Sequence, residues 1–174
     1  NRTEQGGQAE VYYRAFSTGT VFLALGQTEY RFQSPDMAWR NATDRKASLG
    51  ARFPVGGSIE GTISLGYKQF RPQAEAWTSF SGFVGAVNLS VRTGRFAFRG
   101  RYGRDNVFSV YADVLYFLET SGGGGASLYV TDFLRLDYDF ELGTSDYPDE
   151  PAAAGPAGFA GRHDRRTSHS AGFV

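Results

Sequence analysis

The sequence of 174 residues contains no cysteine and has no excess of charge of either sign. The absence of cysteine permits an oxidising compartment such as the periplasm but does not require one. Lys and Arg number 18, and Asp and Glu also number 18. This balance argues against a nucleic-acid partner, because proteins that bind nucleic acids usually carry a basic excess.

The sequence also lacks a long hydrophobic run. Its longest purely apolar stretch, from Val21 to Leu25, has about five residues, whereas a membrane helix needs about 20. The strands of a membrane β-barrel are not excluded, because they distribute their apolar residues in alternation with polar ones. No charged and apolar leader follows Asn1. We therefore expect that a leader was removed or that the sequence begins inside a longer chain.

Glycine and aromatic residues are abundant, with 23 Gly, 15 Phe and 10 Tyr, and this composition favours β-strands with many turns. Short turn sequences recur with a spacing of roughly 37 residues, which is typical of a repeated supersecondary unit. They are Ser17–Gly19, Pro54–Gly57, Arg92–Gly94 and Thr131–Asp132. Longer polar connections lie between them, at Gln33–Thr43, Arg71–Thr78, Arg104–Leu115 and Pro148–Asp164. Alternation of short turns with long loops is typical of outer-membrane barrels.

Hydrophobic and polar residues alternate between these connections, which predicts strands with one apolar and one polar face. The nine expected strands cover residues 8–17, 20–32, 43–53, 58–70, 80–92, 95–106, 115–130, 133–147 and 165–174. The segment 20–32 is less regular, because Leu23 and Leu25 share a face with Glu29 and Arg31. In 115–130 the run Gly122–Gly125 is compatible with a turn or with a glycine-rich strand, and the turn spacing favours the strand.

A soluble barrel or sandwich would show the same alternation, with its apolar face inward. Long strands, dense charges of both signs and aromatic residues near the strand ends favour the membrane instead. The sequence thus predicts an all-β fold, an antiparallel up-and-down transmembrane β-barrel. Six residues are expected to face lipid: Ile59, Leu65, Phe96, Phe98, Leu134 and Phe140. Nine are expected to line the lumen: Arg52, Glu60, Lys68, Arg99, Arg101, Arg135, Asp137, Asp139 and Glu141.

From Val11 to Pro148 the chain resembles the β-barrel porin family of bacterial outer-membrane proteins that is associated with exopolysaccharide gene clusters. The stretches that carry the resemblance are GTVFLAL (19–25), TEYRF (28–32), ASLGARF (47–53), GSIEGTISLGYKQF (57–70), FSGFVG (80–85) and the strand exit DYP (146–148). The resemblance implies an outer-membrane barrel with a role in transport or export, and it supplies no catalytic residue.

Members of this family are longer, and single-chain bacterial barrels normally close with an even number of strands. We therefore expect residues 1–174 to form a single β-barrel domain that is incomplete at both ends. A closed barrel of eight or ten strands is the alternative, if the number of expected strands is wrong by one.

Three features of the sequence are candidates for chemical sites. Asp137, Asp139 and Glu141 could bind Ca²⁺, but their spacing is not that of a calcium loop, and a ladder with Arg99, Arg101 or Arg135 is favoured. The run Gly122–Gly125 lacks the Lys-Ser/Thr pair and the helix of a phosphate loop. The two histidines, His163 and His169, accompany no nucleophile elbow. The sequence therefore predicts no enzyme, no metal site and no cofactor.

Three functions are compatible with these expectations. The first is a porin-like channel or export conduit for polar solutes or polysaccharide, whose charged lining would orient its solutes. The second is a structural or adhesive outer-membrane barrel that is plugged by its own ion pairs. The third is a soluble β-sandwich binding module. For the first two, the expected partner is the lipid bilayer of the bacterial outer membrane.

Overall fold

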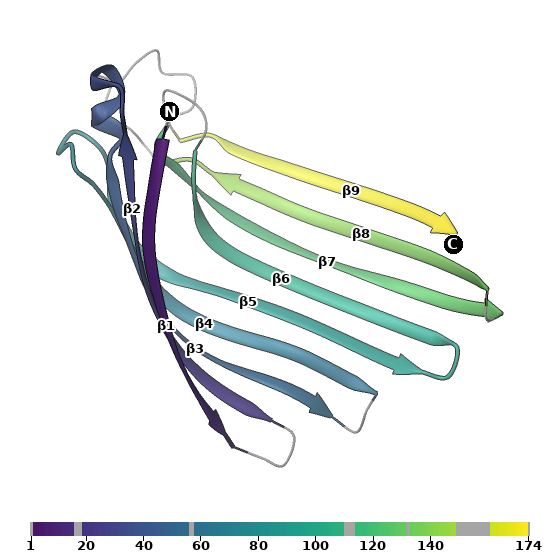
Figure 1. The fold of residues 1–174 in the computed structure, drawn as a ribbon. Coiled ribbons are helices and arrows are strands. Elements are labelled where there is room, and N and C mark those ends of the chain that lie inside the picture. The colour runs from purple at the N-terminus through teal and green to yellow at the C-terminus, as the bar shows by residue number, and fades with distance from the viewer. Residues whose placement is uncertain are drawn as a thin grey trace.

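The computed structural model describes residues 2–15, 19–55, 58–109, 114–131, 133–148 and 161–173. Nine antiparallel strands form one sheet, and their order in the sheet is their order in the chain (Figure 1). The fold is therefore the all-β up-and-down meander that the sequence predicts. The strands are β1 (Arg2–Arg14), β2 (Thr20–Phe32), β3 (Ala42–Val55), β4 (Ile59–Pro72), β5 (Phe80–Thr93), β6 (Phe96–Phe108), β7 (Tyr116–Thr131), β8 (Leu134–Asp146) and β9 (His163–Phe173).

The connections alternate as expected between the two ends of the sheet. Short turns join β1 to β2, β3 to β4, β5 to β6 and β7 to β8 at one end, which we call the turn end. The β5–β6 turn contains Gly94 with φ of 57°, a left-handed conformation that glycine adopts without steric cost. Longer connections lie at the opposite end, the loop end, where a 3₁₀-helix, η1 (Pro35–Arg40), joins β2 to β3. The predicted turn residues Ser17, Thr18, Gly56, Gly57 and Asp132 lie outside the described residues.

The strand limits differ from the expected ones by one to three residues at most strand ends and by six residues at the start of β1. β1 begins at Arg2 rather than at residue 8, because Arg2 to Gly7 continue the ladder opposite Gln27 to Phe32 of β2. β6 extends to Phe108, inside the connection expected from Arg104. The run Gly122–Gly125 lies within β7, so its interpretation as a glycine-rich strand is confirmed.

The sheet is open. In the described part of the chain β1 pairs only with β2 and β9 only with β8, so these two strands form its edges. Among the described residues, no helix is long and apolar enough to span a membrane.

The sheet curves toward one of its faces. Lys46 of β3 contacts Asp105 of β6, although β4 and β5 lie between these strands in the sheet order. We call the face that carries Lys46, Arg99 and Asp139 the concave face, and the face that carries Leu65 and Phe98 the convex face. β6 pairs with β5 only as far as Arg104, and its last residues pair with β7 alone.

Candidate functional site

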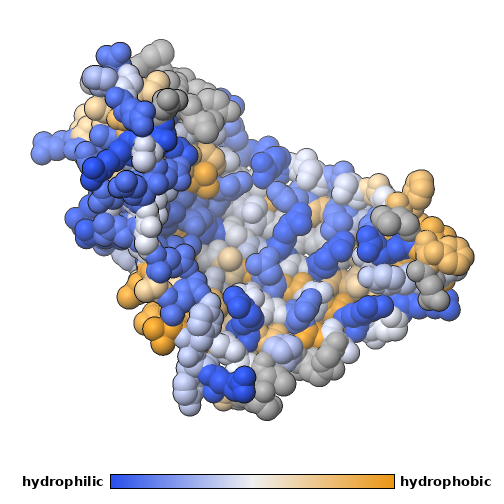
Figure 2. Space-filling view, in the orientation of Figure 1, coloured by the Kyte–Doolittle hydropathy of each residue, from blue (hydrophilic) through white to orange (hydrophobic). Residues whose placement is uncertain are grey.

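The two faces of the sheet separate the charged residues from the apolar ones. In the strand register Glu60, Ser90, Arg99, Gly125 and Asp139 follow one another across five strands, β4 to β8, and therefore share one face. Figure 2 shows hydrophilic side chains in rows over β5 to β8 on the face toward the viewer.

The residues proposed from the sequence separate in the same way. The nine that were expected to line a lumen all lie on the concave face: Arg52, Glu60, Lys68, Arg99, Arg101, Arg135, Asp137, Asp139 and Glu141. The six that were expected to face lipid all lie on the convex face: Ile59, Leu65, Phe96, Phe98, Leu134 and Phe140. That these faces contact a lumen and a bilayer stays a prediction.

Arginines of β6 pair with carboxylates of β8 across the intervening strand β7. The Arg99 guanidinium lies 3.1 Å from the Asp139 carboxylate, and that of Arg101 lies 2.7 Å from the Glu141 carboxylate. Arg135 lies 2.7 Å from Asp137 on its own strand. The three carboxylates that could have bound Ca²⁺ thus each face an arginine, as the ladder interpretation predicts.

Glycines in β7 make these pairs geometrically accessible. Gly125 stands between Arg99 and Asp139 in the register, and Gly123 stands between Arg101 and Glu141. A Cβ atom at Gly125 would lie 2.1 Å from Asp139 Oδ1, and one at Gly123 would lie 2.4 Å from the backbone oxygen of Phe140. Any side chain at these positions would therefore displace the ion pairs or the neighbouring strand.

The ladder continues to the edge strand β9. Arg166 contacts Glu141 at 3.1 Å and Glu119 at 3.3 Å, so Glu141 bridges Arg101 and Arg166. The Ser127 hydroxyl donates a hydrogen bond of 2.5 Å to Asp137. Each ladder arginine keeps between 39% and 63% of its side chain exposed. Ion pairs so exposed stabilise a fold by about 1 kcal/mol or less each, so the ladder contributes more to the charge pattern than to stability.

A second cluster of charges lies at the loop end, around the buried side chain of Lys68. The Lys68 ammonium lies 3.0 Å from Asp44 and 2.8 Å from Asp105, and it donates a hydrogen bond of 2.9 Å to the backbone oxygen of Asn106. The side chain of Lys68 is only 10% exposed. Lys46 also contacts Asp105, at 3.1 Å. This cluster attaches the inward-bent end of β6 to β3 and β4.

An aromatic cluster fills the concave side next to these charges. Phe108 of β6 stacks on Tyr30 of β2 with ring centroids 4.9 Å apart, and it contacts the edge of Phe70 of β4 at 6.0 Å. Phe70 in turn packs against Tyr116 of β7 at 5.3 Å. The Arg40 side chain of η1 donates a hydrogen bond of 2.6 Å to the backbone oxygen of Ser109. Strands that are not neighbours in the sheet therefore meet at the loop end.

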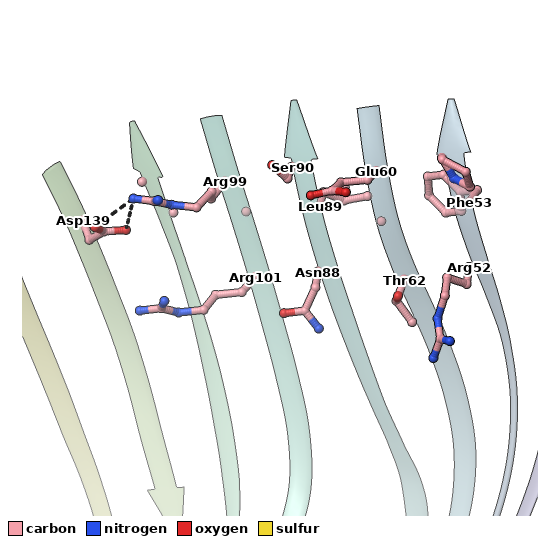
Figure 3. Close-up of a pocket in the computed structure, with 15 residues that line it drawn as sticks. Arg52, Phe53, Glu60, Thr62, Asn88, Leu89, Ser90, Arg99, Arg101 and Asp139 are labelled. Atoms are coloured by element: carbon pink, nitrogen blue, oxygen red, sulfur yellow. Dashed lines mark hydrogen bonds and ion pairs between the residues drawn. The ribbon is translucent and has the colours of Figure 1, made fainter. Parts of the chain in front are cut away.

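The turn end of the concave face is open by contrast. A hollow of about 570 Å³ lies over β3 to β8 there. Figure 3 shows the residues that line it, including Arg52, Glu60, Thr62, Asn88, Ser90, Arg99, Arg101 and Asp139. Within the described part of the chain Glu60 makes no ion pair, unlike Asp139. Among the described residues, the hollow thus exposes to solvent both charged groups that form ion pairs and charged groups that do not.

Sequence reasoning did not identify several members of these clusters: Asp44, Lys46, Asp105, Glu119 and Arg166. Lys46 shares the polar face of an expected strand with Ser48 and alternates with Ala47, and this pattern was a usable signal. Asp105 lies where β6 leaves β5, beyond the run whose alternation is regular. Its contacts with Lys46 and Lys68 depend on the bending of the sheet, which a local pattern does not encode.

Comparison with protein-family models, with curated proteins and with solved structures gave no match. The resemblance to a porin family thus stays a prediction that rests on the sequence stretches alone.

Proposed function

We propose that the nine strands form part of the wall of a β-barrel in a bacterial outer membrane. In this proposal the barrel is a porin-like channel or export conduit for polar solutes or polysaccharide. The convex face would contact lipid, and the concave face would line the aqueous path.

The observation that carries the proposal is a band of apolar side chains on the convex face, with large exposed members on every described strand except β7. Large residues of the band are exposed: Val11, Tyr13, Leu23, Leu25, Leu49, Ile59, Ile63, Leu65, Tyr67, Phe83, Leu89, Phe96, Phe98, Tyr102, Leu136, Tyr138, Phe140, Leu142 and Phe173. Within the stretch of each described strand that these residues span, the convex face carries no Asp, Glu, Lys or Arg.

An aqueous environment does not suit such a surface. Soluble monomers rarely expose a contiguous apolar patch larger than a few hundred Å². The band extends over Ile59–Tyr67 in β4 and Leu134–Leu142 in β8. At about 3.3 Å per residue and a tilt of about 45°, these segments rise roughly 20 Å. The apolar zone of outer-membrane barrels is about 25 Å high, which agrees with a single membrane crossing per strand.

The concave face supports the second part of the proposal, passage of polar solutes. Its strands carry ten basic residues: Arg2, Arg14, Lys46, Arg52, Lys68, Arg92, Arg99, Arg101, Arg135 and Arg166. They also carry ten acidic ones: Glu4, Glu10, Asp44, Glu60, Asp105, Glu119, Asp137, Asp139, Glu141 and Asp164. Equal numbers of the two signs favour passage of neutral polar molecules over selection of one kind of ion.

A second candidate function, a plugged structural or adhesive barrel, is favoured by the loop end. The aromatic cluster around Phe108 and the ions around Lys68 fill the concave side there. The third candidate, a soluble β-sandwich, would require a second sheet over the apolar band. The described residues form one sheet, and its convex face is uncovered.

Conductance in planar bilayers tests the proposal. The full chain is folded into detergent micelles, its β-structure is verified by circular dichroism, and it is then added to a bilayer. We expect stepwise conductance increments. A folded protein that inserts without conductance would favour the plugged barrel. A protein that stays folded and monodisperse in buffer without detergent would contradict the membrane assignment and favour the sandwich.

A further inference from the structure

The convex face carries charge only beyond the loop-end border of the apolar band. Five arginines lie there, on five different strands: Arg31 (β2), Arg45 (β3), Arg71 (β4), Arg104 (β6) and Arg165 (β9). We call this row the arginine belt. The acidic residues of the described strands in the same zone are Glu29 and Asp146.

Most of the belt has no acidic partner. Arg31 is paired with Glu29 at 2.7 Å, and Arg45 donates a hydrogen bond of 3.0 Å to the Gln27 side chain. Arg71, Arg104 and Arg165 are exposed and make no ion pair within the described part of the chain. The belt therefore carries a net positive charge, and an anion outside the protein could pair with its arginines.

The belt follows the tilt of the strands. Arg165 and Arg104 occupy the same register row as Leu65, which is still inside the band on β4. Arg45 pairs with Gln69, four positions beyond Leu65. A line of constant depth in a bilayer must shift in register from strand to strand when the strands are tilted. The belt therefore follows the loop-end border of the apolar band from strand to strand.

The turn end has no such belt. There the convex face of the described strands ends on uncharged residues, among them Tyr13, Phe96, Leu134 and Phe173. A general need for solubility would place arginines at both borders, so their restriction to the loop end indicates a specific partner on that side.

We propose that the arginine belt binds the phosphate groups of lipid headgroups in the leaflet that surrounds the loop end. Arginine forms bidentate hydrogen bonds with phosphate oxygens, and the apolar band directly below the belt would contact the acyl chains of the same lipids. This inference rests on the proposed membrane location. It adds to it a lipid-binding surface and an orientation, with the loop end toward the leaflet that is richer in anionic lipid.

Energy transfer from tryptophan to labelled lipid tests the inference. The only two tryptophans of the chain, Trp39 and Trp77, stack at 4.5 Å in the loop-end connections and serve as donors. The full chain is folded into phosphatidylcholine vesicles that contain a trace of dansyl-labelled phosphatidylglycerol or, in parallel, dansyl-labelled phosphatidylcholine. The ratio of the two transfer efficiencies reports how strongly the anionic lipid is enriched around the loop end.

We expect several-fold enrichment of phosphatidylglycerol around the wild type, because each arginine near an anionic surface strengthens the attraction by about fivefold at most. The variant R45Q/R71Q removes two of the five belt arginines and should lower the ratio severalfold. The control R14Q/R95Q removes two exposed arginines at or near the turn end and should keep the wild-type ratio.

The remaining outcomes separate this inference from the function proposed above. A ratio of one in wild-type protein that is inserted and protected from protease would overturn the belt but leave the membrane proposal intact. Equal losses in both variants would show that total charge, and not the belt, attracts the lipid. Failure of the wild type to insert into any vesicle would overturn both proposals.

Discussion

The Arg101 guanidinium and the Glu141 carboxylate lie 2.7 Å apart although a whole strand separates β6 from β8. Gly123 of β7 stands between them and has no side chain to obstruct the contact. The ion pairs between β6 and β8 thus explain the glycine run of β7. Because these glycines have no side chains, charged residues of β6 and β8 can meet above β7.

Replacing Gly123 by alanine should destabilise the fold. The new methyl would lie 2.4 Å from the backbone oxygen of Phe140, which cannot move without shifting β8. We expect a loss of about 1–3 kcal/mol in the free energy of unfolding, the usual cost of overpacking. Urea titration of protein folded in vesicles measures it. G100A is the matched control, since a Cβ at Gly100 of the adjacent strand meets no atom within 4 Å. Equal costs for the two variants would contradict this explanation of the glycine run.

Replacing Lys68 by methionine should cost far more than the same change at Lys46. Lys68 is 10% exposed and compensates Asp44, which is 11% exposed, whereas the Lys46 side chain is 40% exposed. Removing one partner of a buried ion pair typically costs about 3–5 kcal/mol, whereas an exposed pair contributes about 1 kcal/mol or less. Thermal unfolding of K68M and K46M gives the comparison. The double variant K68M/D44N should recover part of the loss, because it removes the uncompensated charge. No recovery would argue that Lys68 acts through packing alone.

An arginine on the convex face should prevent membrane assembly. L136R places a charge inside the apolar band, at a cost of up to about 4 kcal/mol in a bilayer. D137A, at the next position on the concave face, removes contacts with Ser127 and Arg135 but should leave assembly intact. The fraction of protein that resists protease in vesicles measures assembly. If both variants assemble equally well, the assignment of the faces is reversed.

Reversing the charge at Glu60 should change ion selectivity without changing stability. Glu60 lies in the turn-end hollow and makes no ion pair within the described residues. E60K converts the balanced concave face to one with a basic excess, so the reversal potential under a salt gradient should shift toward that of anions. Its free energy of unfolding should stay within about 0.5 kcal/mol of the wild type, as for most surface substitutions. E75K, a charge reversal in the loop-end connection, is the control and should leave the reversal potential unchanged.

The sequence predicted the strands well because the alternation that marks each strand lies within that strand's own residues. The alternation in 133–142 assigns Leu136 and Asp137 to opposite faces, and this needs only the period of two that every strand shares. The segment 20–32 was less regular because Leu23 and Leu25 share a face with Arg31. In the structure that face crosses the border between the apolar band and the arginine belt, so the mixed pattern reflects the change from one zone of the convex face to the other.

The partners of the charges depended on register and curvature. The sequence suggested that Asp139 pairs with an arginine, but which arginine it meets depends on the alignment of β6, β7 and β8. The buried group around Lys68 was missed because Asp44, Lys68 and Asp105 come from three strands with long sequence separations. Their contacts require β6 to leave β5 after Arg104 and bend over the concave face.

The sequence by itself determined the strand positions, the alternation of short turns with long connections, and the separation of apolar from charged residues between two faces. These properties follow from local backbone geometry and from side-chain alternation. Only the tertiary structure decided that the charged face is the concave one, which ions meet, and that the loop end is filled while the turn end stays hollow. Those features arise from sheet curvature, which accumulates over nine strands and therefore has no signature in any single segment.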